Sequence, residues 1–87
     1  MSKAIWKFPA LGPLFTAQMP IGSRVLSVQS QHGSPQMWAL VDPEKSTELR
    51  QFAFYGTGHP MPDDPGKFVG TFQVDGGDLV FHLFDVT

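Results

Sequence analysis

The chain has 87 residues, six Lys and Arg against eight Asp and Glu, and a net charge of −2. A chain of this length makes one domain, expected over residues 1–87, and buries only about 60% of the surface that its unfolded form exposes. It contains no cysteine, which excludes disulfides and thiolate metal sites and fits a reducing compartment. The acidic balance argues against a nucleic-acid-binding surface, so we expect no nucleic-acid partner.

No apolar run approaches the roughly 18 residues of a membrane span, and the first residues lack the pattern of a signal peptide. We therefore expect a cytoplasmic protein without a membrane partner. Eight Phe, two Trp and one Tyr supply aromatic packing. Because the core of so small a domain is thin, self-association is a further expected support, and we predict a homo-oligomer.

Helix signals are sparse, since eight Pro and nine Gly are spread evenly along the chain. The only plausible helical turn runs from Asp42 to Glu48, with Asp42 as the N-cap and Pro43 as the first helical residue. This segment is short and polar, so we expect one turn or a loop there.

Strand signals recur at intervals of roughly 8–12 residues, as in small sandwiches and barrels. The expected strands are Ala4–Phe8, Leu14–Met19, Arg24–Gln31, Gln36–Val41, Leu49–Tyr55, Lys67–Val74 and the run from Leu79 to Phe84. Parallel pairing needs crossovers of about a dozen or more residues, which the Pro- and Gly-rich connections do not supply. The predicted fold is all-β, a small antiparallel sandwich or barrel of about seven short strands with at most one short helical turn.

Alternation assigns side chains to faces of these strands. It puts Leu26 and Val28 on one face of their strand, and Phe68 and Phe72 together on one face of theirs. The nearly continuous apolar run Gln36–Val41 is typical of a strand covered on both faces.

The last third of the sequence predicts a hairpin. Asp75-Gly76-Gly77-Asp78 separates two alternating runs, and the glycine pair suits a primed turn because both residues take positive φ freely.

The stretch from Tyr55 to Pro60 is the strongest candidate site. Backbone N–H groups around Gly56 and Gly58 are suited to an anion-binding nest, with Thr57 and His59 as donors and Tyr55 as a stacking face. The alternative is a rigid connection that uses glycines for their φ angles and prolines to restrict the unfolded chain. The motif lacks the Gly-Lys-Ser/Thr end and the following helix of a P-loop.

Arg50 shares a strand face with Phe52 and Phe54 and lies upstream of this glycine turn. An arginine beside aromatic side chains can bind phosphate with two hydrogen bonds and stack on a base. The alternative is a surface arginine whose stem lies along apolar neighbours. The predicted ligand-binding set is Arg50, Tyr55, Thr57, Gly58 and His59.

Metal binding by His32, His59 and His82 is a further alternative. Their separations of 27 and 23 residues match no local ligand motif, so we predict no metal site. His82 falls in a predicted strand, where a partly buried structural role is the simpler interpretation.

Catalytic signals are weak. The acidic pairs Asp63-Asp64 and Asp75 with Asp78 fall in predicted turns, where Asp supports Asx-type hydrogen bonds. No serine has a Gly-x-Ser-x-Gly context. We predict no catalytic residues and no cofactor, and therefore a protein that is not an enzyme.

A set of ordered motifs covers almost the whole chain: Ile5-Trp6-Lys7-Phe8-Pro9, Met19-Pro20-x-Gly22, Leu26-Ser27-Val28-Gln29, Trp38-Ala39-Leu40-Val41-Asp42-Pro43, Tyr55-Gly56-Thr57-Gly58-His59-Pro60, Gly70-Thr71-Phe72 and Val80-Phe81-His82. Together they resemble a family of small uncharacterised proteins of bacteriophages and prophages. The resemblance implies an accessory phage protein acting in the host cytoplasm, and proteins of that kind often counter bacterial defence.

These observations lead to a function hypothesis with two alternatives. The leading one is a non-enzymatic binding protein that sequesters a small anionic, nucleotide-derived signal in pockets shared between subunits. The second is a protein–protein inhibitor of a host defence complex, such as an anti-CRISPR, that uses a strand edge or an aromatic patch. The third is a small hydrolase of a signalling nucleotide that uses His59 and an Asp as acid and base.

Overall fold

Seven strands and one short 3-10 turn make up the fold in the computed structural model, which describes residues 2–87. The elements are β1 (Ala4–Pro9), β2 (Leu14–Pro20), β3 (Arg24–Gln31), β4 (Ser34–Val41), β5 (Thr47–Gly56), β6 (Lys67–Val74), η1 (Asp75–Gly77) and β7 (Leu79–Asp85). The all-β prediction and the position of each expected strand are confirmed, with end points that differ by no more than two residues.

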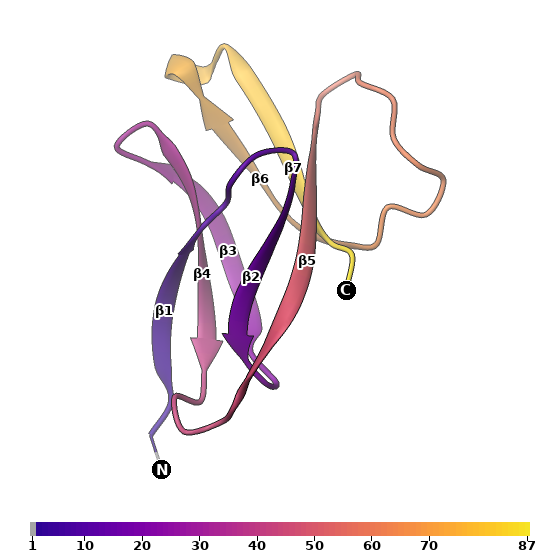
Figure 1. Ribbon diagram of the computed structural model, residues 1–87. Coiled ribbons are helices and arrows are strands. Elements are labelled where there is room, and N and C mark those ends of the chain that lie inside the picture. The colour runs from indigo at the N-terminus through magenta and orange to yellow at the C-terminus, as the bar shows by residue number, and fades with distance from the viewer. Residues whose placement is uncertain (1) are drawn as a thin grey trace.

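The strands form two antiparallel sheets that lie face to face (Figure 1). One sheet has the order β1-β4-β3, and the other has the order β2-β5-β7-β6. Every neighbouring pair is antiparallel. The chain crosses between the sheets after β1, β2 and β4, so sequence neighbours often lie in different layers.

The core lies between the inner faces of the two sheets. Met37 and Ala39 of β4 are fully buried and face the four-stranded sheet, and Phe52 of β5 and Leu83 of β7 are fully buried and face the three-stranded sheet. The expectation that Gln36–Val41 is covered on both faces is wrong, because the alternate residues of β4 are only half-buried. Only the inner side of the three-stranded sheet is covered by the other sheet, and the half-buried residues of β4 lie on its outer side.

Two β-bulges correct the face assignments made by simple alternation. In β3 the register shifts between Val25 and Ser27, and in β6 it shifts between Phe68 and Gly70. The unpaired residues are Leu26 in β3 and Val69 in β6, and each reverses the alternation for the residues that precede it. Val28 is buried but Leu26 is exposed, and Phe72 is buried but Phe68 is 55% exposed.

The bulged strands β3 and β6 belong to different sheets and close one side of the sandwich. A Cβ atom on Gly70 would lie 3.1 Å from Cγ1 of Val28, so the glycine lets the strands approach. The Ser30 hydroxyl donates a hydrogen bond to the carbonyl oxygen of Gln73.

The turns follow the local sequence. Gly76 and Gly77 both have positive φ, and Asp78 N–H donates to the carbonyl of Asp75 at 3.1 Å, which is a primed turn inside the predicted hairpin. The segment after Asp42 is a turn in which the Asp42 carboxylate accepts a hydrogen bond from Glu44 N–H, with no helix. Within residues 2–87 no helix has the length and apolarity to cross a bilayer.

Candidate functional site

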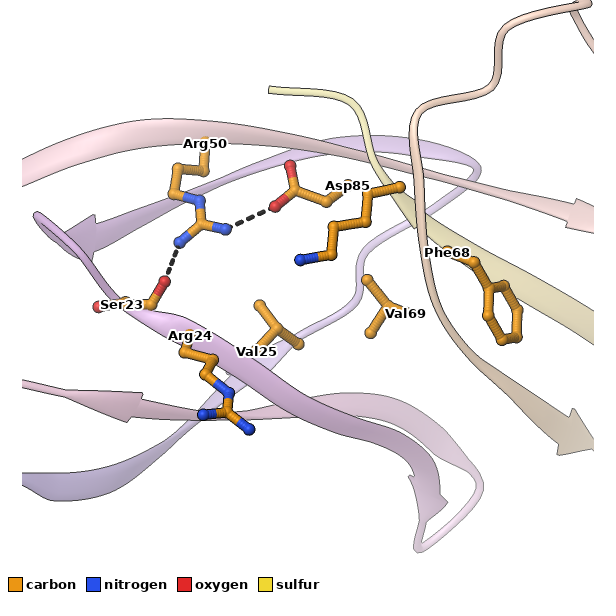
Figure 2. A pocket seen from close by; sticks show the side chains of 8 residues that line it. Ser23, Arg24, Val25, Arg50, Phe68, Val69 and Asp85 are labelled. Atoms are coloured by element: carbon orange, nitrogen blue, oxygen red, sulfur yellow. Dashed lines mark hydrogen bonds and ion pairs between the residues drawn. The ribbon is translucent and has the colours of Figure 1, made fainter.

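Arg50 points into the sandwich from β5, on the same face as Phe52, as alternation predicts. Its guanidinium donates to the Asp85 carboxylate of β7, with 2.5 Å between Nη2 and Oδ2, and to the carbonyl of Ser23 in the β2–β3 turn (Figure 2). Its Cζ atom lies 5.7 Å from the centre of the Phe52 ring. The Arg50 side chain is 13% exposed, so it is not the surface arginine of the second interpretation, and its guanidinium joins three segments of the chain.

Asp85 is the anionic partner of Arg50. Partial burial raises the pKa of Asp85, but this is outweighed by hydrogen bonds from the Thr87 N–H and from Arg50 and by the charge of Arg50. The net effect holds the pKa of Asp85 below its ordinary value of 3.8. The carboxylate is therefore ionised at neutral pH and keeps Arg50 in one orientation.

A pocket of about 200 Å³ lies beside this ion pair. Ser23, Arg24, Val25, Arg50, Lys67, Phe68, Val69 and Asp85 line it. Three of these residues are cationic and one is anionic, so three of the six Lys and Arg in the chain gather at one pocket of an acidic protein. We call this the Arg50 pocket.

The free cations of the Arg50 pocket are Arg24 and Lys67. Both are exposed, and within the described residues neither forms an ion pair. Lys67 is the register partner of Asp85, and Figure 2 shows the Arg24 guanidinium directed away from Arg50 and Asp85. The arrangement supplies one fixed and two adjustable positive groups.

The glycine turn lies at the other end of β5. His59 N–H donates to the Gly56 carbonyl at 3.0 Å, and Gly58 has a φ of 83°, so a β-turn spans Gly56 to His59. Gly56 has a different reason to be glycine, because an added Cβ atom would lie 2.6 Å from Nδ1 of His59. The imidazole folds back over the chain in the space that Gly56 leaves.

The backbone amides of this turn do not make the expected anion nest. Thr57 N–H donates to the Val80 carbonyl at 3.1 Å, and His59 N–H is used inside the turn. Two of the donors that a nest needs are therefore already satisfied by carbonyl groups. A pocket of about 280 Å³ does lie here, and Asp78 of the β6–β7 loop is one of its lining residues. Its side chains bring one carboxylate and no Lys or Arg.

His82 holds the turn to the sheet. Its Nε2 lies 2.7 Å from the hydroxyl of Thr57, and its Nδ1 lies 2.9 Å from the hydroxyl of Thr71. Both ring nitrogens thus have hydroxyl partners, as a partly buried structural histidine requires. The hydroxyl of Thr57 is therefore already used within the fold.

Tyr55 lies on the outer face of the four-stranded sheet, opposite to Arg50. Its ring packs against Phe84 with 6.1 Å between ring centres, and Phe84 packs against Phe68 at 5.6 Å. This row of three aromatic rings crosses β5, β7 and β6. Through Phe84, Tyr55 is part of a surface cluster.

The predicted ligand set is therefore divided within one chain. Thr57 and His59 line one pocket, with Gly58 in their turn, whereas Arg50 lines another and Tyr55 faces outward. These five residues therefore do not line one pocket within a single chain. Most of the length of β5 separates Arg50 from the glycine turn, and alternation along β5 places Tyr55 on the opposite face of the sheet from Arg50.

Sequence reasoning missed Asp85, Lys67 and Arg24 as neighbours of Arg50. The signal for Asp85 was available, because alternation from Phe81 and Leu83 carries Asp85 to the same inner face. A carboxylate at an inward position calls for a cationic partner. The register of β6 and the position of the β2–β3 turn, which bring in Lys67 and Arg24, depend on the tertiary fold.

The three histidines lie apart, in the β3–β4 turn, in the glycine turn and in β7. Within the described part of the chain no group of three His, Asp or Glu side chains is arranged to hold a metal ion.

Comparison with known proteins gives a family and no activity. No match to a curated protein or to a solved structure was found. The model of a family described as a domain of unknown function, DUF7352, matches residues 1–87. This match spans the full sequence, and the chain belongs to the DUF7352 family.

Proposed function

We propose that this protein is a non-catalytic binding protein that captures a small anionic ligand at the Arg50 pocket. The observation that carries the proposal is the gathering of Arg24, Arg50 and Lys67 around one pocket with a single carboxylate. Asp85 neutralises one of the three positive charges, so the pocket keeps a surplus of two. An anion that enters gains charge-assisted hydrogen bonds from groups without a competing partner.

The geometry favours a phosphate-bearing ligand. Arg50 is held by Asp85 and Ser23, so the position of its guanidinium in the pocket is fixed. Arg24 and Lys67 have long side chains that can close on the ligand from two sides, and their ordering costs about 0.5–1.5 kcal/mol each. Multiple charges on a phosphate or pyrophosphate offset that cost better than a single carboxylate does.

The pocket is small for a whole nucleotide. Its volume of about 200 Å³ lies below the roughly 300–1,000 Å³ of typical small-molecule sites. We infer that it takes the phosphate part of a nucleotide-derived ligand, while the remainder extends over the surface or against a second subunit. The resemblance to phage accessory proteins supports a defence signal of this class as the ligand, sequestered in the host cytoplasm.

Isothermal titration with pyrophosphate tests the anion site. The informative variant is Arg24→Gln/Lys67→Gln, which removes the two exposed positive charges and leaves the Arg50–Asp85 pair intact. The matched control is Lys3→Gln/Lys45→Gln, which changes the net charge equally at two exposed positions outside the pocket. We expect binding by the wild type and the control, and at least a tenfold weaker affinity in the pocket variant. Equal affinities in the two variants, or no heat with the wild type, would refute the site.

The ligand class is tested by titration with cyclic di- and trinucleotides and ADP-ribose derivatives. Mass spectrometry of small molecules released by heating the protein, purified from a host with active defence, is the complementary measurement. A phosphorylated compound recovered with the wild type but not with Arg24→Gln/Lys67→Gln supports sequestration. Recovery of no such compound, together with no heat from any of these ligands, contradicts it.

A protein–protein inhibitor of host defence is the second candidate. The specific observation is the exposed apolar surface of the four-stranded sheet, where Leu14 is 72%, Leu49 64% and Phe68 55% exposed. Exposed patches of this kind mark interaction sites. A stoichiometric host protein captured by the wild type and lost with Phe68→Ser would favour this function, and capture unaffected by that change would argue against it.

A further inference from the structure

The four outer strands of the two sheets differ in how their open edges are protected. Unpaired strand edges attract other strands, and proteins cover or blunt them. The edges of β3 and β6 lie against each other, with the Ser30 hydroxyl bonded to the backbone of Gln73. The edges that remain are those of β1 and β2.

The β1 edge is blunted. Ala10 N–H donates to the Pro35 carbonyl, which shows that the even-numbered residues of β1 form the backbone hydrogen bonds with β4. The odd-numbered residues Ile5, Lys7 and Pro9 therefore direct their backbone groups away from the sheet. A lysine and a proline are the residues that natural edge strands use to prevent pairing. β1 is therefore a poor partner for another strand.

The β2 edge has less protection, because its outward residues carry no charge and its one outward proline, Pro20, is the last residue of the strand. The bonds from Phe54 N–H to the Pro13 carbonyl and from Ile21 N–H to the Ser46 carbonyl show that odd-numbered residues of β2 bond to β5. Alternation then directs the backbone groups of Leu14, Thr16 and Gln18 outward. None of the three is charged or a proline, and their side chains are exposed.

These three outward residues are evenly spaced about Thr16. We propose that the β2 edge pairs antiparallel with the β2 edge of a second copy, across a two-fold axis at Thr16. Leu14 of each copy then lies opposite Gln18 of the other, and three residue pairs exchange about six backbone hydrogen bonds.

A second copy fits this edge because an antiparallel pair of identical strands satisfies itself. The same surface serves both partners, as in other two-fold interfaces. The strand carries no charge, so no like charges oppose each other at the axis. Pairing joins the two four-stranded sheets into one continuous sheet and leaves the Arg50 pocket of each copy open. The dimer surface is independent of the proposed anion site.

Sedimentation equilibrium tests the pairing. The wild type is expected at twice the monomer mass of 9.6 kDa, and Thr16→Lys, which sets two lysines opposite each other at the axis, is expected at the monomer mass. Ile5→Lys is the matched control on the β1 edge and is expected to stay dimeric. A mixture of Thr16→Lys and Thr16→Glu is expected to recover the dimer. A monomeric wild type, or a dimer that persists in Thr16→Lys, overturns the proposal.

A single cysteine gives a second, independent test, because the chain has no cysteine of its own. Directly opposed hydrogen-bonded residues have Cα atoms about 5.5 Å apart, which lies within disulfide range. Thr16→Cys is therefore expected to form a covalent dimer under mild oxidation, while Ile5→Cys stays largely monomeric. Equal cross-linking of both variants, or of neither, contradicts the register.

Discussion

The two ends of β5 show how one strand can present two kinds of pocket. At the Arg50 end, an ion pair, a turn carbonyl and two free cations surround a small positive cavity. At the His59 end, the pocket is formed by a tight glycine turn whose amides and hydroxyl are already bonded to the fold. The first end keeps charge available for a ligand, whereas the second uses its polar groups to hold itself together.

The comparison teaches that motif density is a poor guide to where charge gathers in the fold. The glycine turn holds the most distinctive local sequence, yet its donors are satisfied internally. Arg50 stands in an ordinary aromatic strand, yet the fold brings two further cations to it from distant segments. Unsatisfied charge, which depends on the tertiary structure, separates the two ends.

Removal of Arg50 is expected to have the largest effect. Arg50→Met leaves the half-enclosed Asp85 carboxylate and the Ser23 carbonyl without their partner, and we expect a loss of about 3 kcal/mol in the free energy of unfolding. Urea denaturation at pH 7 measures it. At the other end of β5, the His59 side chain makes no hydrogen bond within the described residues. The loss in the free energy of unfolding for His59→Ala should therefore be clearly smaller. Equal losses for Arg50→Met and His59→Ala would contradict the difference between the two ends of β5.

Acid is expected to weaken the Arg50 end next. The pKa of Asp85 is lowered in the folded state, so its contribution is fully present above the unfolded value near 3.8 and is lost as pH falls through the folded value. Urea midpoints measured from pH 6 down to pH 2 should fall more steeply for the wild type than for Asp85→Asn. Parallel curves for the two proteins would show that Asp85 is not stabilised by the fold.

The two glycines of the turn are expected to respond differently to alanine. Gly58→Ala places a side chain at a φ of 83° and should cost about 1 kcal/mol whatever occupies position 59. Gly56→Ala clashes with the His59 ring and should also cost about 1 kcal/mol, but this cost should vanish in a His59→Ala background. A double-mutant cycle at each glycine measures the coupling. Coupling at Gly58, or none at Gly56, would contradict the geometry.

The threonine contact of His82 is expected to have the smallest effect. Thr57→Val removes one hydroxyl partner of the ring at a well-exposed position, and we expect about 0.5 kcal/mol. Thr57→Ser keeps the hydroxyl and serves as the control. If urea denaturation shows a loss for Thr57→Ser but none for Thr57→Val, the hydroxyl contributes nothing and the methyl group is responsible.

Most of the fold was predictable because β-strands record their period in the sequence. The strands Arg24–Gln31 and Lys67–Val74 were predicted with the ends that the structure shows. The errors within them came from two bulges, at which one inserted residue reverses the alternation. No glycine or proline near Leu26 marks the first bulge, whereas Gly70, directly after the inserted Val69, is the kind of isolated strand glycine that indicates the second.

The candidate site was less predictable because its parts come from distant segments. Alternation placed Arg50 correctly beside Phe52 and could have placed Asp85 as well. The positions of Arg24 and Lys67 depend on how the β2–β3 turn and the start of β6 meet at one end of the sandwich. No periodic pattern encodes that meeting, and only the assembled sheets bring these charges together.

The most direct test of the account is a titration with pyrophosphate followed by backbone amide NMR, because it reports on both ends of β5 at once. We expect saturable shift changes at the Arg50 end, in residues 23–25 and 67–69, with the amides of residues 56–59 unchanged. Shift changes centred on residues 56–59, or none that saturate anywhere, would contradict the assignment of the anion site to the Arg50 pocket.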